Sequence, residues 1–335
     1  LADLSAMKKH AEYATGSSSF TQTLRKLVGA DSKRFFNYFM SYGATKPGSI
    51  DVLIMDEAHR IREKTGYPFK ATGNPQVEDL LKACKVGVFL LDDLQVVRPK
   101  EIGRSAFIKE HAESMGCVVH EIKLETQFRC AGSEAFISWV DHMLHVGITA
   151  HPEWVPDPNF DFRIFPDPQS MEDAIRAKVA EGATGRMMAG YCWPWSDRPL
   201  DDGTLPNDVV IGNYKRPWNA RPDIKGLAKN IPRSHFWAYE PGGLDQVGCI
   251  YTAQGFEFDY AGIIIGKDMV YDFAANAWNG QPAHCHDGLV KGSRKFLDLV
   301  KNTYRVLLTR GQKGCYVCFL DKDTENYFRS RIRRV

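Results

Sequence analysis

Short apolar runs alternate along this chain with longer amphipathic stretches, and this alternation constrains the fold more than any other feature of the sequence. Apolar runs of a few residues are typical of strands buried on both faces, and the amphipathic stretches are typical of covering helices. The pattern predicts an α/β protein with parallel sheets. The expected strands are 52–55, 86–91, 187–192, 247–251, 263–265 and 315–320, and the expected helices are 105–115, 134–144, 171–180 and 296–306.

The length of 335 residues favours two domains, each with a sizeable core. Prolines at positions 152, 156, 158 and 166 disfavour regular structure between Thr149 and Pro168. We therefore expect one domain over 1–150 and a second over 151–335. The stretch 193–241 is rich in Pro, Trp, Gly and Asp, and together with 272–291 it is expected to form long irregular insertions in the second domain.

Composition excludes several classes of protein. With 44% hydrophobic and 25% charged residues, the chain is globular, and no apolar run approaches the ~20 residues of a membrane helix. Eight cysteines are too sparse for a disulfide scaffold, which favours a reducing, cytoplasmic compartment. Over 291–335, twelve basic residues face four acidic ones. Such an end would suit a phosphate backbone, and a solvated helix end is an equal alternative.

The sharpest local signal is the segment Asp51–His59, in which an apolar strand is followed by Asp56 and Glu57. Ligands bind at the carboxyl ends of the strands in open α/β sheets. There, Asp56 could hold Mg²⁺ through water, and Glu57 could polarise a water molecule that attacks a γ-phosphate. The alternative is that these residues only cap the next helix.

Other apolar stretches are also bordered by polar or cationic groups, and a glutamine such as Gln95 could sense a γ-phosphate, although a simple turn is the alternative. These segments are Asp92–Gln95, Gln127–Arg129, Gln254–Glu257 and Tyr304–Arg310. With Asp56-Glu57, they resemble in order motifs II, III, IV, V and VI of superfamily 1 helicases. The longer strings 124–130, 246–260 and 300–310 are similar to a bacterial DNA/RNA helicase domain family related to group 3 Schlafen proteins. The resemblance covers about Asp51 to Leu320.

The resemblance implies two RecA-like domains that bind ATP with Mg²⁺ in a cleft between them and act as a motor on DNA or RNA. It assigns the Mg²⁺ contact to Asp56, the catalytic base to Glu57 and the phosphate sensor to Gln95. Charge on the transferring phosphoryl would be neutralised by Arg129 and Arg310. The nucleotide would be lined by Gln254, Gly255 and Glu257, and nucleic acid would be contacted by Thr252.

Two departures from the family pattern stand out. Leu91 occupies a position before Asp92 where glycine is usual, and no G-x-x-x-x-G-K-[ST] phosphate loop occurs in these residues. In the family this loop lies upstream of the region that corresponds to Leu1. We therefore expect a first domain that is truncated at its N-terminus, a missing upstream segment that carries the loop, and poor activity of this piece alone.

Weaker patterns suggest other chemistry. Trp218 and Arg216 could stack on bases and track phosphates, although most such rings pack loops onto a sheet. Cys315 and Cys318 invite a zinc interpretation, but residues three apart in a strand point to opposite faces. The cluster His284–Asp287 supports a metal-dependent nuclease as a distant alternative. A non-catalytic, NTPase-like binding module is the nearer alternative to the motor.

Overall fold

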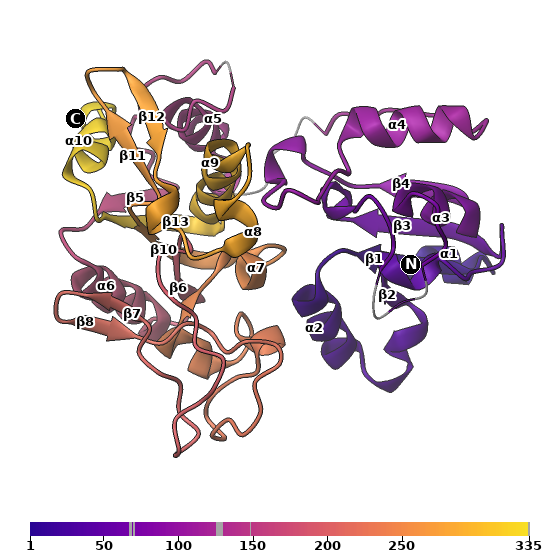
Figure 1. Ribbon diagram of the computed structural model, residues 1–335, viewed down its shortest axis with the longest axis horizontal. Helices are drawn as coiled ribbons and strands as arrows, with labels where there is room; N and C mark the ends of the chain where they lie inside the picture. The colour runs from indigo at the N-terminus through magenta and orange to yellow at the C-terminus, as the bar shows by residue number, and fades with distance from the viewer. Residues whose placement is uncertain (67–68, 70, 125–129, 148, 334–335) are drawn as a thin grey trace. The chain divides into compact units, whose positions relative to one another are not determined.

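The computed structural model describes residues 1–66, 69, 71–124, 130–147 and 149–333, and it divides into two compact units, Leu1–Lys123 and Leu124–Val335. Each unit is built on its own parallel sheet with helices packed against it (Figure 1). The α/β class and the parallel sheets expected from the sequence are therefore confirmed.

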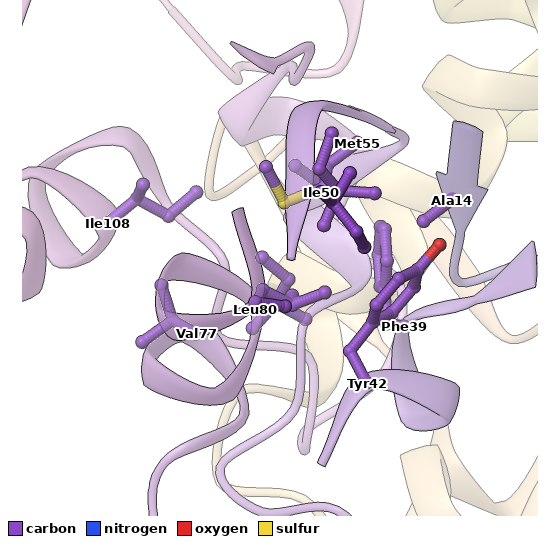
Figure 2. Packing of buried hydrophobic residues seen from close by; sticks show 12 residues of the cluster. Ala14, Phe39, Tyr42, Ile50, Met55, Val77, Leu80 and Ile108 are labelled. Atoms are coloured by element: carbon purple, nitrogen blue, oxygen red, sulfur yellow. The ribbon is translucent and has the colours of Figure 1, made fainter. Parts of the chain in front are cut away.

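The described residues of the first unit form a parallel sheet in the order β2-β1-β3-β4. Its core lies between β3 and α3, where Leu53 and Met55 are fully buried against Val77 and Leu80 (Figure 2). The strands are β1 (Ala11–Thr15), β2 (Phe36–Tyr38), β3 (Ile50–Asp56) and β4 (Cys84–Phe89), and the helices are α1 (Ala2–Ala6), α2 (Ser18–Val28), α3 (Gln76–Ala83) and α4 (Ser105–Ser114).

The strand β4 has the sequence of an interior strand and the position of an edge strand. Its apolar run predicts burial on both faces. In the sheet that the described residues form, however, β4 pairs only with β3, and Val86 and Val88 are 54% and 38% exposed. An exposed apolar edge of this kind favours pairing with another strand.

The second unit has a parallel sheet in the order β5-β13-β10-β6-β9, and two antiparallel hairpins, β7-β8 and β11-β12, lie outside it. The strands are β5 (Asp161–Ile164), β6 (Gly185–Ala189), β7 (Val209–Ile211), β8 (Tyr214–Arg216), β9 (Val247–Gly248), β10 (Phe258–Ile265), β11 (Met269–Asp272), β12 (Ala277–Gly280) and β13 (Gly311–Phe319). The helices are α5 (Glu134–Met143), α6 (Pro168–Ala180), α7 (Ile250–Ala253), α8 (Gly288–Lys291), α9 (Phe296–Leu308) and α10 (Lys322–Ser330). Within the described ranges, no helix is both long and apolar enough to cross a membrane.

The two compact units divide earlier in the chain than the sequence predicts. Helix α5 precedes the expected boundary at 150, yet its Trp139 ring packs edge-on against Phe328 of α10, and its indole nitrogen donates to the Arg331 carbonyl at 3.2 Å. The prolines at 152, 156 and 158 lie in the connection from α5 to β5 within the second unit, and Pro166 lies between β5 and α6. The sequence predicts no regular structure between Thr149 and Pro168, but the strand β5 lies inside this range, so the prolines neither exclude a strand there nor mark the division.

One predicted strand, 247–251, is largely a different structure. Only Val247 and Gly248 are in β9, and α7 begins at Ile250. The last residue of the strand, Gly248, lies directly against the Trp237 ring. A Cβ at this position would lie 2.2 Å from the indole, so only glycine fits there. The insertion 193–241 that contributes Trp237 is mostly irregular, with the short hairpin β7-β8 inside it.

Candidate functional site

The carboxyl end of the sheet in the first unit gathers the acidic residues that the sequence singles out. Asp56 is the last residue of β3, and Thr15 at the end of β1 is its partner in the register of the two strands. On the other side of β3, the strand β4 leads into a short 3-10 turn, Asp93–Gln95. The structure therefore places Asp56, Glu57 and Gln95 at one edge of one sheet, as predicted.

The Asp56 carboxylate is held from two sides. Its Oδ1 atom accepts a hydrogen bond of 2.8 Å from the Glu57 backbone N–H, and its Oδ2 atom accepts one from the Tyr13 hydroxyl. Burial raises the pKa of Asp56 above its usual value, and the Tyr13 hydrogen bond acts in the opposite direction. Because a carboxylate oxygen can accept two hydrogen bonds, each oxygen keeps a lone pair for a water molecule.

Glu57 occupies a strained backbone position with a buried side chain. Its φ of 55° lies in the left-handed region, which costs a non-glycine residue about 1–3 kcal/mol and is common at functional sites. The side chain is 9% exposed, and its Oε2 atom lies 3.1 Å from His59 Nε2. The imidazole therefore lies within contact distance of the Glu57 carboxylate and limits its orientation.

Neighbouring segments hold the turn that carries Glu57. The Ala58 N–H donates to the Leu90 carbonyl at 2.9 Å, and the Ile102 N–H donates to the Ile61 carbonyl at 2.8 Å. Gly103 packs so closely that a Cβ there would lie 1.9 Å from the Ala58 carbonyl oxygen. These contacts retain a backbone conformation that the isolated sequence would not favour.

Gln95 is buried close behind this turn. Its side-chain nitrogen donates to Asp92 Oδ2 at 3.2 Å, and the other oxygen of Asp92 caps the turn through the Leu94 N–H. The residue is 3% exposed. Its hydrogen bond to Asp92 shows how the side chain is oriented, and its role as a sensor stays a prediction.

In the second unit the structure brings Arg310 together with the segment Gln254–Glu257. The guanidinium donates to the Val306 carbonyl at 2.9 Å and to the Phe256 carbonyl at 3.3 Å, and Arg310 is 1% exposed. Gly255 has a φ of 92°, which favours glycine at this turn. These residues precede β10 and β13, so they lie at the amino ends of those strands.

The residues predicted to contact nucleic acid are engaged inside the second unit. Trp218 is 1% exposed and stacks on Tyr191, with ring centroids 5.8 Å apart. Thr252 is buried and donates to Asn219 Oδ1 at 2.8 Å. Arg216 donates hydrogen bonds of 2.8 and 2.9 Å to the carboxylate of the buried Glu172. These contacts argue against the predicted base and phosphate contacts, because the same side chains pack the insertion onto α6 and the sheet.

The other predicted sites receive no geometric support from the described residues. Arg129 lies outside them, so the structure does not place it. No group of three or more His, Cys, Asp or Glu side chains that could hold a metal occurs in the described part of the chain. In the cluster His284–Asp287, Asp287 caps α8 and accepts from the Tyr251 hydroxyl. Cys315 and Cys318 are buried free thiols in β13.

Tyr13 and Thr15 lie beside Asp56 but are not among the residues that the sequence singles out, whereas His59 ends the predicted segment Asp51–His59 and lies beside Glu57. The strand β1 that carries Tyr13 and Thr15 is short and mixed in polarity, so it does not form an apolar run. A weaker signal precedes α2, where Ser17 caps the helix by accepting from the Phe20 N–H. A strand that ends in a capped helix start would have identified the neighbour of β3.

The family is decided by a comparison that spans nearly the whole chain. The family described as "Schlafen group 3, DNA/RNA helicase domain" matches residues 1–321. The chain belongs to this family. This Schlafen group 3 helicase domain is also 27% identical over 299 residues to the uncharacterized protein YPL245W of Saccharomyces cerevisiae. That alignment covers 82% of this chain and 63% of the yeast protein, so the chain spans less than two thirds of its relative's length.

Solved structures of yeast Dbp5 show a weak similarity. Dbp5 bound to RNA and ADP BeF3 is 11% identical with a TM-score of 0.32, and the match covers 98% of this chain and 77% of Dbp5. A Dbp5 variant bound to a Gle1 variant and IP6 is 10% identical with a TM-score of 0.38, covering 98% and 76%. The family assignment does not depend on these similarities.

Proposed function

We propose that this Schlafen group 3 helicase domain is the motor portion of an NTPase that hydrolyses ATP and acts on DNA or RNA. The observation that carries the proposal is the pair of carboxylates at the carboxyl edge of the first sheet. Glu57 is held there by a left-handed turn and by His59, and Asp56 is held by two hydrogen bonds. A strained, buried and well-oriented acid beside a second acid is suited to activating water.

In this proposal Glu57 accepts a proton from the attacking water. His59, 3.1 Å away, keeps the carboxylate oriented. Gln95 orients the water or the terminal phosphate from the neighbouring strand. Water reaches phosphorus in line with the leaving oxygen, so the reaction depends on positioning more than on covalent chemistry by the protein.

The oxygen atoms at this edge fit a Mg²⁺ ion that arrives with the nucleotide. Mg²⁺ is commonly bound by one or two carboxylates together with waters and phosphates, so a cage of protein ligands is not needed. Asp56 would hold it through water, with the lone pairs that Tyr13 and Glu57 leave available. When bound, Mg²⁺ neutralises charge that develops on the phosphate oxygens.

For the second unit we propose that Gln254, Gly255 and Glu257 form a loop that contacts the nucleotide and couples it to nucleic acid. Arg310 fixes this loop through Phe256, and Arg129 is left as the cation that would approach the transferring phosphoryl. Because Arg216 is engaged by Glu172, we assign phosphate contacts in the insertion to two of its exposed lysines, Lys215 and Lys225.

The test is Glu57→Gln in the full-length protein, with phosphate release measured at saturating ATP in the presence of DNA or RNA. We expect turnover to fall by about 10²–10⁴-fold, because a general base contributes that much, while nucleotide affinity stays unchanged. Glu113→Gln, an exposed change on α4, is the matched control and should keep full turnover.

Three outcomes would redirect the proposal. Full turnover in Glu57→Gln would contradict the role of Glu57 as base. Nucleotide binding without any turnover in the unaltered protein would favour the non-catalytic binding module. Metal-dependent cleavage of nucleic acid that survives Glu57→Gln would favour a nuclease.

A further inference from the structure

The Tyr13 ring is fixed in the first unit by two other aromatic rings. The ring of Phe36 on β2 meets it edge-on, with centroids 5.8 Å apart, and the ring of Phe20 on α2 lies 6.5 Å away. Tyr13 is half-buried between them. Because neighbouring elements clamp the ring, the position of its hydroxyl is set by the packing of the sheet and of α2.

The register of β1 and β3 aims this hydroxyl at the acidic tip. Tyr13 pairs with Ile54, and Thr15 pairs with Asp56. Residues two apart in a strand share a face, so Tyr13 and Thr15 lie on the same face as Asp56. Tyr13 lies two register positions before Asp56. The length of the tyrosine side chain spans this offset, and the hydroxyl donates to Asp56 Oδ2.

Together with the Glu57 N–H on Oδ1, the hydroxyl fixes both oxygens of the carboxylate. Rotation of the carboxylate about its Cβ–Cγ bond would break both hydrogen bonds. We propose that Tyr13 is a positioning residue, which holds the Asp56 carboxylate in the orientation that receives a divalent cation carried by the nucleotide. This inference rests on the proposed function, because it takes Asp56 as the group that faces the cation.

If Tyr13 positions Asp56, removing the Tyr13 hydroxyl should change the affinity for the cation. A hydroxyl that only supplies a hydrogen bond to a buried carboxylate does not make this prediction. Partners that orient a metal-binding side chain affect metal affinity by about 10–100-fold when they are removed. The aromatic clamp should matter as well, although neither Phe36 nor Phe20 contributes a polar group. Loosening the clamp should therefore weaken cation binding even while the hydroxyl is still present.

The experiment measures Mn²⁺ affinity by electron paramagnetic resonance in the full-length protein with ADP, a readout that needs no turnover. Tyr13→Phe keeps the ring and removes the hydroxyl, and we expect Mn²⁺ to bind about 10–100-fold more weakly. Phe36→Leu should weaken Mn²⁺ in the same direction by a smaller factor. The matched control is Tyr38→Phe on β2, whose hydroxyl accepts from Gln22 at 2.7 Å. This variant should bind Mn²⁺ as the unaltered protein does.

Asp56→Asn separates this inference from the function on which it rests. If Asp56→Asn leaves Mn²⁺ affinity unchanged, Asp56 does not face the cation and the proposed function loses its metal contact. If Asp56→Asn weakens Mn²⁺ but Tyr13→Phe does not, the positioning role alone is overturned. An effect of Tyr13→Phe with no effect of Phe36→Leu also overturns positioning, because only the polarity of the hydroxyl would then matter.

Discussion

Replacing Arg216 with alanine distinguishes a structural arginine from one that contacts nucleic acid. The carboxylate of Glu172 on α6 is fully buried, and the Arg216 guanidinium donates to its two oxygens at 2.8 and 2.9 Å. Two other groups also donate to this carboxylate: Arg176 at 2.7 Å and the Tyr214 hydroxyl at 2.8 Å. Arg216→Ala thus removes the charged hydrogen bonds between the hairpin β7-β8 and α6, and the bond from Tyr214 of β8 to Glu172 stays.

The expected loss of stability depends on how well the Glu172 charge stays compensated after Arg216 is removed. Removing one partner of a buried ion pair commonly destabilises a protein by about 3–5 kcal/mol. Here the Arg216 side chain is 29% exposed, and Arg176 and Tyr214 still serve Glu172. We therefore expect Arg216→Ala to lower the free energy of unfolding of the second unit by about 2 kcal/mol, near the range for a hydrogen bond to a charged group.

Urea unfolding followed by tryptophan fluorescence measures this unit selectively, because all seven tryptophans lie within Leu124–Val335. Lys215→Ala, an exposed neighbour in the same hairpin, is the control and should change stability by less than about 0.5 kcal/mol. Combining Arg216→Ala with Glu172→Gln should recover part of the loss, since the buried charge is then removed. A large loss of nucleic-acid affinity with unchanged unfolding would refute this reasoning.

Two further predictions concern a buried acid and an exposed edge. Burial raises the pKa of Asp268 above its usual 3.8, while Tyr304 donates to it at 2.7 Å. The stability that Asp268 contributes is therefore full below pH 3.8 and is lost as pH rises through the pKa of the folded state. In urea unfolding, the free energy of unfolding of Asp268→Asn should exceed that of the unaltered protein by an amount that grows with pH, by at most about 1.4 kcal/mol per pH unit. A difference that does not change with pH would contradict this. On the edge strand β4, Val86→Lys should reduce self-association of the 335-residue chain, measured by sedimentation. Val210→Lys on β7, which also replaces an exposed valine, is the control and should not reduce it. Equal effects of the two changes would rule out β4 as the site of self-association.

Sequence patterns predict the strands that have a continuous apolar run, including the exposed β4, and do not predict a strand of mixed polarity. The runs in β3, β10 and β13 were predicted because parallel strands buried on both faces have a continuous apolar composition. The strand β1 was missed because Ala11–Thr15 alternates small, charged and aromatic residues and is only partly buried. Tyr13 and its contact with Asp56 were missed with it.

Aromatic composition misled the prediction of the nucleic-acid contacts for a physical reason. A tryptophan between cations has the same sequence signature whether it stacks on a base or packs a long insertion. In 193–241 the rings pack the insertion onto the rest of the second unit, where Trp218 stacks on Tyr191 and Trp237 lies against Gly248 of β9. Only burial distinguishes the two cases, and burial depends on contacts distant in the sequence.

The rule that ligands bind at the carboxyl ends of parallel strands fits the placement of the predicted residues in the first unit and not in the second. Asp56 is the last residue of β3, whereas Glu257 and Arg310 directly precede β10 and β13, so they lie at the opposite ends of their strands. Arg310 is also bonded to two backbone carbonyls, one in α9 and one at Phe256. Removing its side chain would therefore release the loop that holds Gln254 as well as remove a charge. For this reason a loss of turnover in an Arg310 variant would not identify an arginine finger, and the proposed hydrolysis is better tested at Glu57.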